Sequence, residues 1–257
     1  MNDDTVVLGY CEFGKPYLNQ IVVSGENSPG VNPLRHQEIK ADLDALPSGV
    51  GAVLYLHWGR EHVWLPPTAD IELARKFLED DRVKLIVGMH AHRVQGYIEH
   101  NGKRAYMCVG NFLFPNFYIE PPTQIAYPDS VPERPWVTRQ YHAVQKLTYK
   151  KWRWVNRVSM LVSFDTKTEQ VSHSFACQND VDPKVDDLSG IRRVFMSAFV
   201  IFLCGVYRFP VPVYSIIEHV HATISKFLWR LQIRSFSIRQ MGLRTFVLKL
   251  RKKLSAK

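Results

Sequence analysis

Three histidines stand at positions where short apolar runs end. His57 follows the run Gly51–Leu56, and His90 and His92 come shortly after the run Val83–Val87. Apolar runs of this length indicate buried strands. Two residues that are two positions apart can point to the same side. Because neutral imidazole nitrogen is the commonest protein ligand for zinc and similar ions, the three histidines are candidate metal ligands. The alternative is that they form hydrogen bonds in loops or lie exposed.

Other polar side chains follow the same runs. Glu61 lies on the turn after Trp58, where a carboxylate can bind substrate, orient His57 or act as a general base. It can equally be a solvated carboxylate. Gln95 is a candidate to hydrogen-bond a substrate or a ligand, and the alternative is an exposed strand residue. Asn111 can fix the loop beside the histidines through backbone hydrogen bonds, and the ring of Trp58 can form the floor of a pocket.

The segments that carry these residues predict an α/β fold. Periodicity and turn residues predict strands over Thr5–Tyr10, Gly51–Leu56 and Val83–Val87 and a helix over Leu34–Leu46. They also predict a second helix that is capped by Thr68 or Asp70 and runs through Leu78. Asn101-Gly102 between two apolar segments predicts a hairpin, and a second hairpin is expected over 149–177. Strand–helix–strand order followed by hairpins indicates α/β layers with a mixed sheet.

Three short sequence motifs of this chain resemble motifs of the bacterial capsule-synthesis CapA family. That family is a branch of the calcineurin-like metallophosphoesterase fold and is implicated in making poly-γ-glutamate. Leu56-His57-Trp58-Gly59-Arg60-Glu61 is similar to the family's LHWG-E block. The segment His90–Gln95 is similar to its H-x-H-x-x-Q block, and Val109-Gly110-Asn111-Phe112 to its S-L-G-N-F block.

The resemblance implies a site as well as a fold. The fold would be partial metallophosphoesterase-like mixed β-sheets flanked by helices. A divalent metal (Mn, Zn or Fe) would be held by His57, His90 and His92, with Glu61 and His57 as catalytic residues. The ion would polarise a phosphoryl or acyl oxygen. Trp58, Gln95 and Asn111 are the residues expected to contact substrate.

The resemblance covers about residues 5–178, which correspond to the second half of the family domain. The first half supplies a G-D strand end, an N-L-E block and an N-N-H block, and this sequence contains none of them. A two-metal site needs carboxylates, one of which bridges the ions. The sequence is therefore a fragment, or a separate chain completes it, or the protein is a relative without the full chemistry. Phosphoesterase-like hydrolysis is expected only if the missing half is supplied.

Charge is concentrated near the carboxyl terminus. The formal net charge is +9, and the segment His219–Lys257 holds ten Lys and Arg with no Asp or Glu. The other 218 residues therefore sum to −1. A cationic segment of this kind favours anionic partners. We expect a CapA-like domain over residues 1–178, a polar linker over 179–193 and a basic amphipathic helical extension over 194–257.

The remaining sequence features concern the cellular location of the protein. Four separated cysteines favour free thiols in a reducing compartment, and the acidic start at Met1 does not resemble a signal peptide. The apolar run Val194–Tyr207 is shorter than the roughly 20 residues that a spanning helix needs. We expect a protein that is cytoplasmic or peripheral to the membrane. The basic and aromatic residues of Lys146–Arg157 suit an exposed strand or a membrane anchor as well as nucleic acid, so no specific nucleic acid is expected.

Two functions follow from these expectations. The first is synthesis or export of an anionic capsule polymer such as poly-γ-glutamate, with a polymer or a phosphoester as the substrate of metal-dependent hydrolase or transferase chemistry. The second is non-catalytic: an accessory at the membrane surface, bound through the basic helices, that keeps the fold but lacks half of the metal site.

Overall fold

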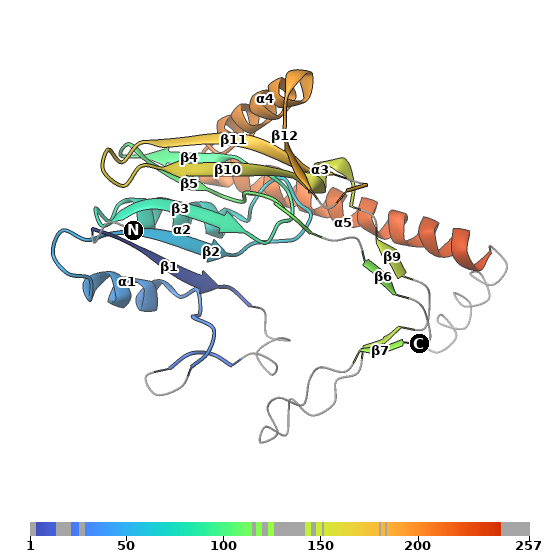
Figure 1. Cartoon of the computed structure of the whole chain (residues 1–257), viewed down its shortest axis with the longest axis horizontal. Helices are drawn as coiled ribbons and strands as arrows, with labels where there is room; N and C mark the ends of the chain where they lie inside the picture. Colours follow the sequence, from blue (N-terminus) through green and yellow to red (C-terminus); the bar gives the residue numbers. More distant parts are fainter. Residues whose placement is uncertain are drawn as a thin grey trace.

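A five-stranded mixed sheet forms the centre of the molecule (Figure 1). The computed structural model describes residues 4–13, 22–25, 29–114, 117–119, 123–125, 142–144, 148–150, 152–179, 181–182 and 184–242. The strands of the main sheet are β1 (Thr5–Cys11), β2 (Gly51–His57), β3 (Val83–Met89), β4 (Tyr97–His100) and β5 (Lys103–Tyr106), in the order β1-β2-β3-β5-β4. All of them are parallel except β4, which pairs with β5 as a hairpin.

Two helices connect the parallel strands. Helix α1 (His36–Asp44) joins β1 to β2, and α2 (Thr68–Leu78) joins β2 to β3. Each presents an apolar face to the sheet, with Ile39 and Leu43 buried on α1 and Ile71, Ala74, Phe77 and Leu78 buried on α2. Such crossovers make the strands parallel, so that their carboxyl ends meet at one edge.

A smaller antiparallel sheet covers part of the other face. It consists of β10 (Val158–Phe164), β11 (Val171–Gln178) and β12 (Val185–Asp187), and the one-turn helix α3 (Trp154–Arg157) precedes it. Leu85 and Tyr106 of the main sheet pack with Met160 and Phe175 of the smaller one in a second core cluster. Two short pairs lie apart from both sheets (Figure 1): β6 (Phe117–Ile119) with β9 (Thr148–Lys150), and β7 (Thr123–Ile125) with β8 (His142–Val144).

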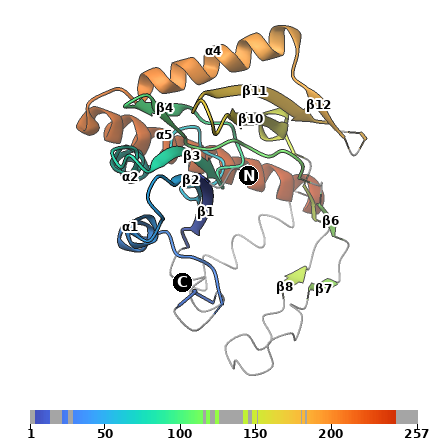
Figure 2. The ribbon, with the colours of Figure 1, turned by 60° about the vertical axis from the view of Figure 1, so that its left-hand side comes forward.

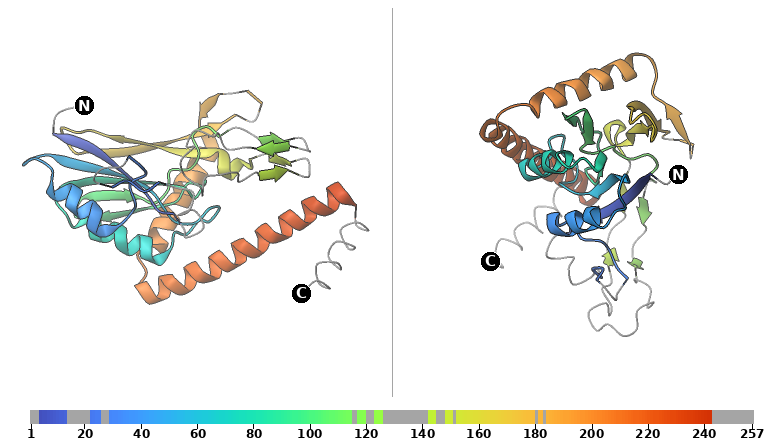
Figure 3. Two further views of the ribbon diagram at one scale, coloured as in Figure 1. Left: turned by 90° about the horizontal axis from the view of Figure 1, so that it is seen from below. Right: turned by 90° about the vertical axis from the view of Figure 1, so that its left-hand side faces the viewer.

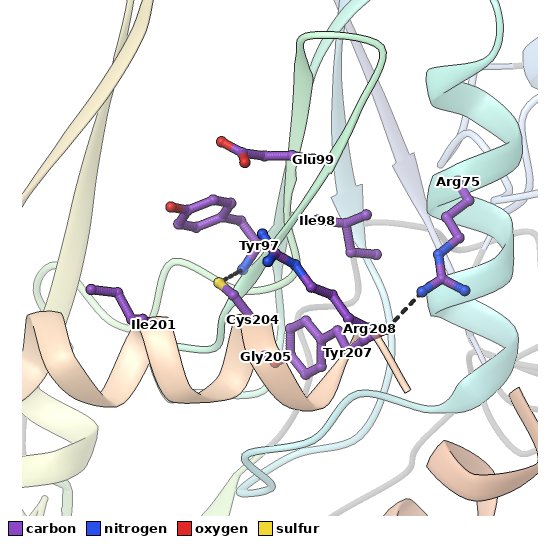
Figure 4. A pocket seen from close by; sticks show the side chains of 9 residues that line it. All are labelled: Arg75, Tyr97, Ile98, Glu99, Ile201, Cys204, Gly205, Tyr207 and Arg208. Atoms are coloured by element: carbon purple, nitrogen blue, oxygen red, sulfur yellow. Dashed lines mark hydrogen bonds between the residues drawn. The ribbon is translucent and has the colours of Figure 1, made fainter. Parts of the chain in front are cut away.

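Two helices follow the second sheet. Helix α4 (Gly190–Val206) crosses the side of the molecule formed by β4 and β11 (Figure 2), and α5 (Val211–Met241) is a long rod that extends past the sheets (Figure 3). The corner between them is fixed by hydrogen bonds. The side chain of Arg75 donates to the carbonyl of Tyr207 at 2.6 Å, and the amide of Tyr97 donates to Cys204 Sγ at 3.2 Å. Both bonds border a cavity of about 270 Å³ that also contains Arg208 (Figure 4).

The predicted α/β class is confirmed, as are the strands over β1, β2 and β3 and the hairpin at Asn101-Gly102. Both hairpin residues have positive φ, 51° and 75°, which a tight turn of this kind requires. Helix α2 is preceded by Pro67 and has no side-chain cap, so neither Thr68 nor Asp70 caps it.

The structure differs from the predicted organisation at the boundary of the carboxyl-terminal part. The expected linker, 179–193, contains β12 and the first turn of α4. Met196, Val200 and Leu203 of α4 are buried in the two core clusters. Helix α4 therefore packs as part of the core, because one of its apolar faces covers β4 and β11. The expected irregular segment Pro115–Arg139 lies mostly outside the described residues, as does the tail after Gly242.

Candidate functional site

The carboxyl ends of β1, β2 and β3 bring the first histidines together. In register, His57 at the end of β2 lies between Cys11 of β1 and Met89 of β3, and His90 follows directly. The imidazole rings of His57 and His90 are 4.3 Å apart between centroids. Cys11 Sγ is 3.3 Å from His57 Nδ1. We call this region the histidine edge.

The backbone of the histidine edge is held in an unusual conformation. His62, His90 and His92 all have positive φ, at 61°, 103° and 54°. For residues other than glycine this costs of the order of 1–3 kcal/mol each and persists only where the surroundings enforce it. Here the amide of His62 donates to the carbonyl of Ala91 at 2.8 Å, which ties the two loops together. Strain of this kind is concentrated at functional sites.

A network of two asparagines orients His92. Asn111 Nδ2 donates to the carbonyl of Asn156 at 3.0 Å, so Asn111 Oδ1 is the atom that faces His92 Nδ1 at 2.8 Å. A carbonyl oxygen only accepts, and His92 Nδ1 therefore carries a hydrogen. In the neutral ring the lone pair is then on Nε2. Asn156 Nδ2 in turn donates to the backbone carbonyl of His92 at 2.8 Å. This arrangement fixes the tautomer and the orientation of His92, as supporting residues do around ligands of a metal.

His92 lies farther from the pair than His57 and His90 lie from each other. Its ring centroid is 6.2 Å from that of His90, and it packs against Trp152 at 5.7 Å. His62 lies on the same side, 5.5 Å from His92. The edge therefore holds an imidazole pair with two further imidazoles beside it.

Burial favours the neutral form of the paired imidazoles. Desolvation lowers the pKa of His57 and of His90 below the ordinary histidine value, and for His90 the neighbouring His57 acts in the same direction. Glu61 is exposed, and its Oε2 is 3.9 Å from His62 Nε2. The two predicted catalytic residues, His57 and Glu61, thus lie at the same edge, with His62 next to the carboxylate.

Three residues expected to contact substrate have structural partners. Trp58 is buried, and its Nε1 donates to the carbonyl of Met107 at 2.9 Å. Gln95 is buried, and its Nε2 donates to the carbonyl of Val63 at 3.1 Å. Asn111 is buried in the network described above. These bonds support the loops of the edge, and substrate contact by these side chains stays a prediction.

A buried carboxyl group lies beneath the turn after His57. Gly59 has φ 84°, and its amide donates to Glu12 Oε2 at 3.1 Å. A Cβ at this glycine would lie 3.1 Å from Asp70 Oδ2. Among the described residues that oxygen has no hydrogen-bond partner, and only 8% of Asp70 is exposed. Burial first, and then the Glu12 carboxylate, raise the pKa of Asp70 to about 7.

The described residues do not by themselves fit a complete metal site. No group of three or more His, Cys, Asp or Glu side chains in this part of the chain is arranged to hold an ion. His57 and His90 are close enough to act as two ligands, but His92 is turned toward Asn111 and Trp152. A metal at the edge would need further ligands, and metal binding by the three histidines stays a prediction.

A cleft of about 490 Å³ opens beside the histidine edge. One wall is the turn Arg60-Glu61-His62, and the other is the face of α5 that carries His219 and Lys226. Arg60 forms an ion pair with the buried Glu218 of α5, which joins the two walls. The cleft thus connects the edge with the basic helix.

The fold and the edge define an α/β protein whose functional groups lie where parallel strands end, the usual position of ligand sites in such sheets. Residues 6–116 match the family model described as bacterial capsule synthesis protein PGA_cap. The resemblance drawn from the three blocks is confirmed here. The matched segment includes His57, His90, His92 and Asn111 and ends before β10. No curated protein is significantly similar to the chain.

Sequence reasoning missed five residues of the site: Cys11, Glu12, His62, Asp70 and Asn156. Cys11 and Glu12 stand at the end of a predicted strand, and that position was the available signal. Asp70 resembled a helix cap, although Pro67 precedes the helix. Asn156 reaches the edge from a one-turn helix outside the family match, and no sequence pattern marks it.

Replacing Asp70 with Asn should stabilise the protein most at high pH. An unfolded aspartate titrates near a pKa of about 3.9, so the folded state binds more protons than the unfolded state between that value and about 7. The contribution of Asp70 to the free energy of unfolding therefore falls as pH rises through this window. We expect the gain from Asp70→Asn to be about 2–4 kcal/mol larger at about pH 8 than at about pH 4, measured by urea unfolding.

The matched control is Glu72→Gln, which changes an exposed carboxylate on the same helix and should have little effect at either pH. An Asp70→Asn effect that is the same at both pH values would contradict the raised pKa.

Proposed function

We propose that the histidine edge serves the synthesis or export of an anionic capsule polymer such as poly-γ-glutamate. The family of residues 6–116 connects the protein with capsule synthesis in general. The observation that carries the finer proposal is the contact between His57 and His90 at the carboxyl ends of β2 and β3, inside the matched segment. The pair forms a prepared site, because the backbone of His90 is held at positive φ at an energetic cost.

The cleft supplies the binding surface for the polymer in this proposal. Lys226 can attract carboxylates that extend along α5, while Arg60 is held by Glu218. Glu61 and His62 at the inner end are groups that can move a proton near the imidazole pair. Asp70 holds a proton near neutral pH directly beneath Gly59.

Further ligands for a metal would come from another polypeptide segment. The face of the main sheet beside β10 is incompletely covered: a groove of about 480 Å³ is lined by Val7, Tyr55 and Val87 on one side and by Met160 and Val162 on the other. In the described part of the chain, β1 pairs along its length only with β2. At Cys11 the other edge of β1 is already occupied, because the Cys11 amide donates to the carbonyl of Asn32 and the Cys11 carbonyl accepts from the amide of Leu34. The part of β1 before Cys11 is open in the described part of the chain, and an open strand edge beside an apolar groove suits added β-structure.

A non-catalytic role at a membrane surface is the second candidate. It is favoured by the distribution of exposed apolar side chains, because among the described residues 14 of the 20 large ones lie between Ile191 and Leu231, on α4, on α5 and in the turn that joins them. Exposed apolar patches of this extent mark interaction sites. In this role the edge would keep its structure without completing a metal site.

The isolated chain should bind a single Zn²⁺ or Mn²⁺ ion weakly through His57 and His90. Two imidazoles give an incomplete ligand set, so we expect a weak isotherm in calorimetric titration that His57→Ala or His90→Ala abolishes. The matched control is His100→Ala. His100 ends the antiparallel strand β4 and therefore lies at the other edge of the sheet from His57 and His90, so this variant should leave binding unchanged. Two tightly held equivalents together with robust phosphodiesterase turnover would contradict the incomplete site.

Poly-γ-glutamate should bind in the cleft beside α5. Reversing one charge of the wall with Lys226→Glu should weaken binding of a fluorescein-labelled oligomer by about tenfold, measured by fluorescence polarisation at low salt. Lys167→Glu makes the same change of charge at the distant β10–β11 turn and should have little effect. If both variants bind like the unmodified protein, the cleft does not hold the polymer.

A further inference from the structure

Helix α4 has two apolar faces. The inner face, with Met196, Val200 and Leu203, is buried against the sheets. The opposite face is exposed and carries Ile191, Val194, Phe195, Ile201 and Phe202, between 56% and 86% accessible. These five residues, here called the outer stripe, recur at intervals of three, four and seven, so that they line one side of the helix. Ala198 and Gly205 continue this side with small exposed residues.

The charged side chains on α4 and directly after it are all positive, whereas Glu99 of β4 lines the same cavity as Ile201 and Arg208. Arg192 and Arg193 lie in the first turn of α4, and Arg208 follows its last turn; all three are exposed. The sequence between Asp187 and Glu218 contains no acidic residue. The stripe is therefore an apolar surface bounded at both ends by guanidinium groups, which bind phosphate through paired hydrogen bonds.

These charges argue against a second copy of the chain as the occupant. If two outer stripes packed antiparallel, Arg192 and Arg193 of one copy would face Arg208 of the other. A parallel arrangement would place the same arginines opposite each other. With no carboxylate on this segment, either pairing brings like charges together in an apolar interface, which is destabilising. A surface that offers both phosphate groups and hydrocarbon avoids this conflict.

We propose that the outer stripe of α4 inserts into the interfacial region of a membrane that contains anionic lipid. The helix would lie in the plane of the surface, with the three arginines at the level of the phosphates. Its 17 residues correspond to about 25 Å. Because the inner face is committed to the core, only one side of α4 is free to enter lipid. No helix in the described part of the chain is long and apolar enough to cross a membrane.

The membrane contact through α4 rests on the membrane-surface role proposed above, but it assigns the contact to a different segment of the chain. The sequence predicted binding through the basic segment at the end of the chain, whereas the exposed apolar area begins at Ile191. Helix α5 also carries exposed apolar residues, among them Val213, Ile216 and Val220. Deleting everything after Ser189 would not test the idea, since it would also remove Met196, Val200 and Leu203 from the core.

Vesicle co-sedimentation of the full chain tests the outer stripe. The probes are vesicles of phosphatidylcholine alone and of phosphatidylcholine with phosphatidylglycerol. We expect the double variant Phe195→Ser, Phe202→Ser to lower partition onto the anionic vesicles by about tenfold. The matched control is Phe112→Ser, Leu113→Ser, a pair of similarly exposed side chains on a loop, which should partition like the unmodified protein. Arg192→Glu with Arg193→Glu should remove the preference for anionic lipid.

Both aromatic side chains of the test variant are more than half exposed, although they also stack on Phe199. Thermal unfolding and circular dichroism of the variant, compared with the unmodified protein, show that it is folded when partition is measured. Equal partition of this variant and the unmodified protein, or no partition of either, would overturn the inference. So would a concentration-dependent dimer in sedimentation velocity that the same variant abolishes, because the stripe would then bind a second copy. None of these measurements involves metal or polymer, so their failure is distinguishable from failure of the proposed function at the histidine edge.

Discussion

The parallel register of β1, β2 and β3 is the constraint on which the site depends. It pairs Cys11 with His57 and His57 with Met89, so the residues after these strands emerge at one edge. A shift by one residue would turn each side chain to the opposite face. Gly88 also fixes this arrangement, because a Cβ there would lie 2.1 Å from the carbonyl of Met107 and 2.5 Å from Trp58 Nε1. The absence of a side chain at Gly88 leaves room for the hydrogen bond from Trp58 Nε1 to the carbonyl of Met107.

The residues that emerge at this edge are restrained from several directions. Asn111 and Asn156 orient His92 from the loop after β5 and from α3, while Glu12 holds the turn at Gly59 from the end of β1. The positive φ values of His62, His90 and His92 show that this arrangement opposes local backbone preference. Tertiary contacts therefore determine the geometry of the imidazoles. A site built in this way is prepared for a ligand before the ligand arrives, which reduces the free energy lost in ordering it.

The sequence predicted the parts of the fold that depend on local pattern. The strands that end at Tyr10 or Cys11, at His57 and near Met89, and the Asn101-Gly102 hairpin, follow from periodicity and turn chemistry. The position of the histidines at strand ends was also readable. The role of Asn156 could not be predicted from the sequence, because it depends on a hydrogen bond to the carbonyl of His92, which is 64 residues away in the chain. The sequence also does not show that α4 has one buried and one exposed apolar face, because a continuous apolar run does not reveal which face packs against protein.

The proposed function combines a segment that matches a capsule-synthesis family model with a cleft between the histidine edge and α5. Its central claim is that His57 and His90 are in direct contact in solution, at the ring separation of 4.3 Å. Nuclear Overhauser measurements on protein with isotope-labelled histidine test this most directly. The account predicts cross-peaks between the ring protons of His57 and His90 that disappear in His90→Asn. The absence of these cross-peaks in a folded protein, with both rings assigned, would contradict it.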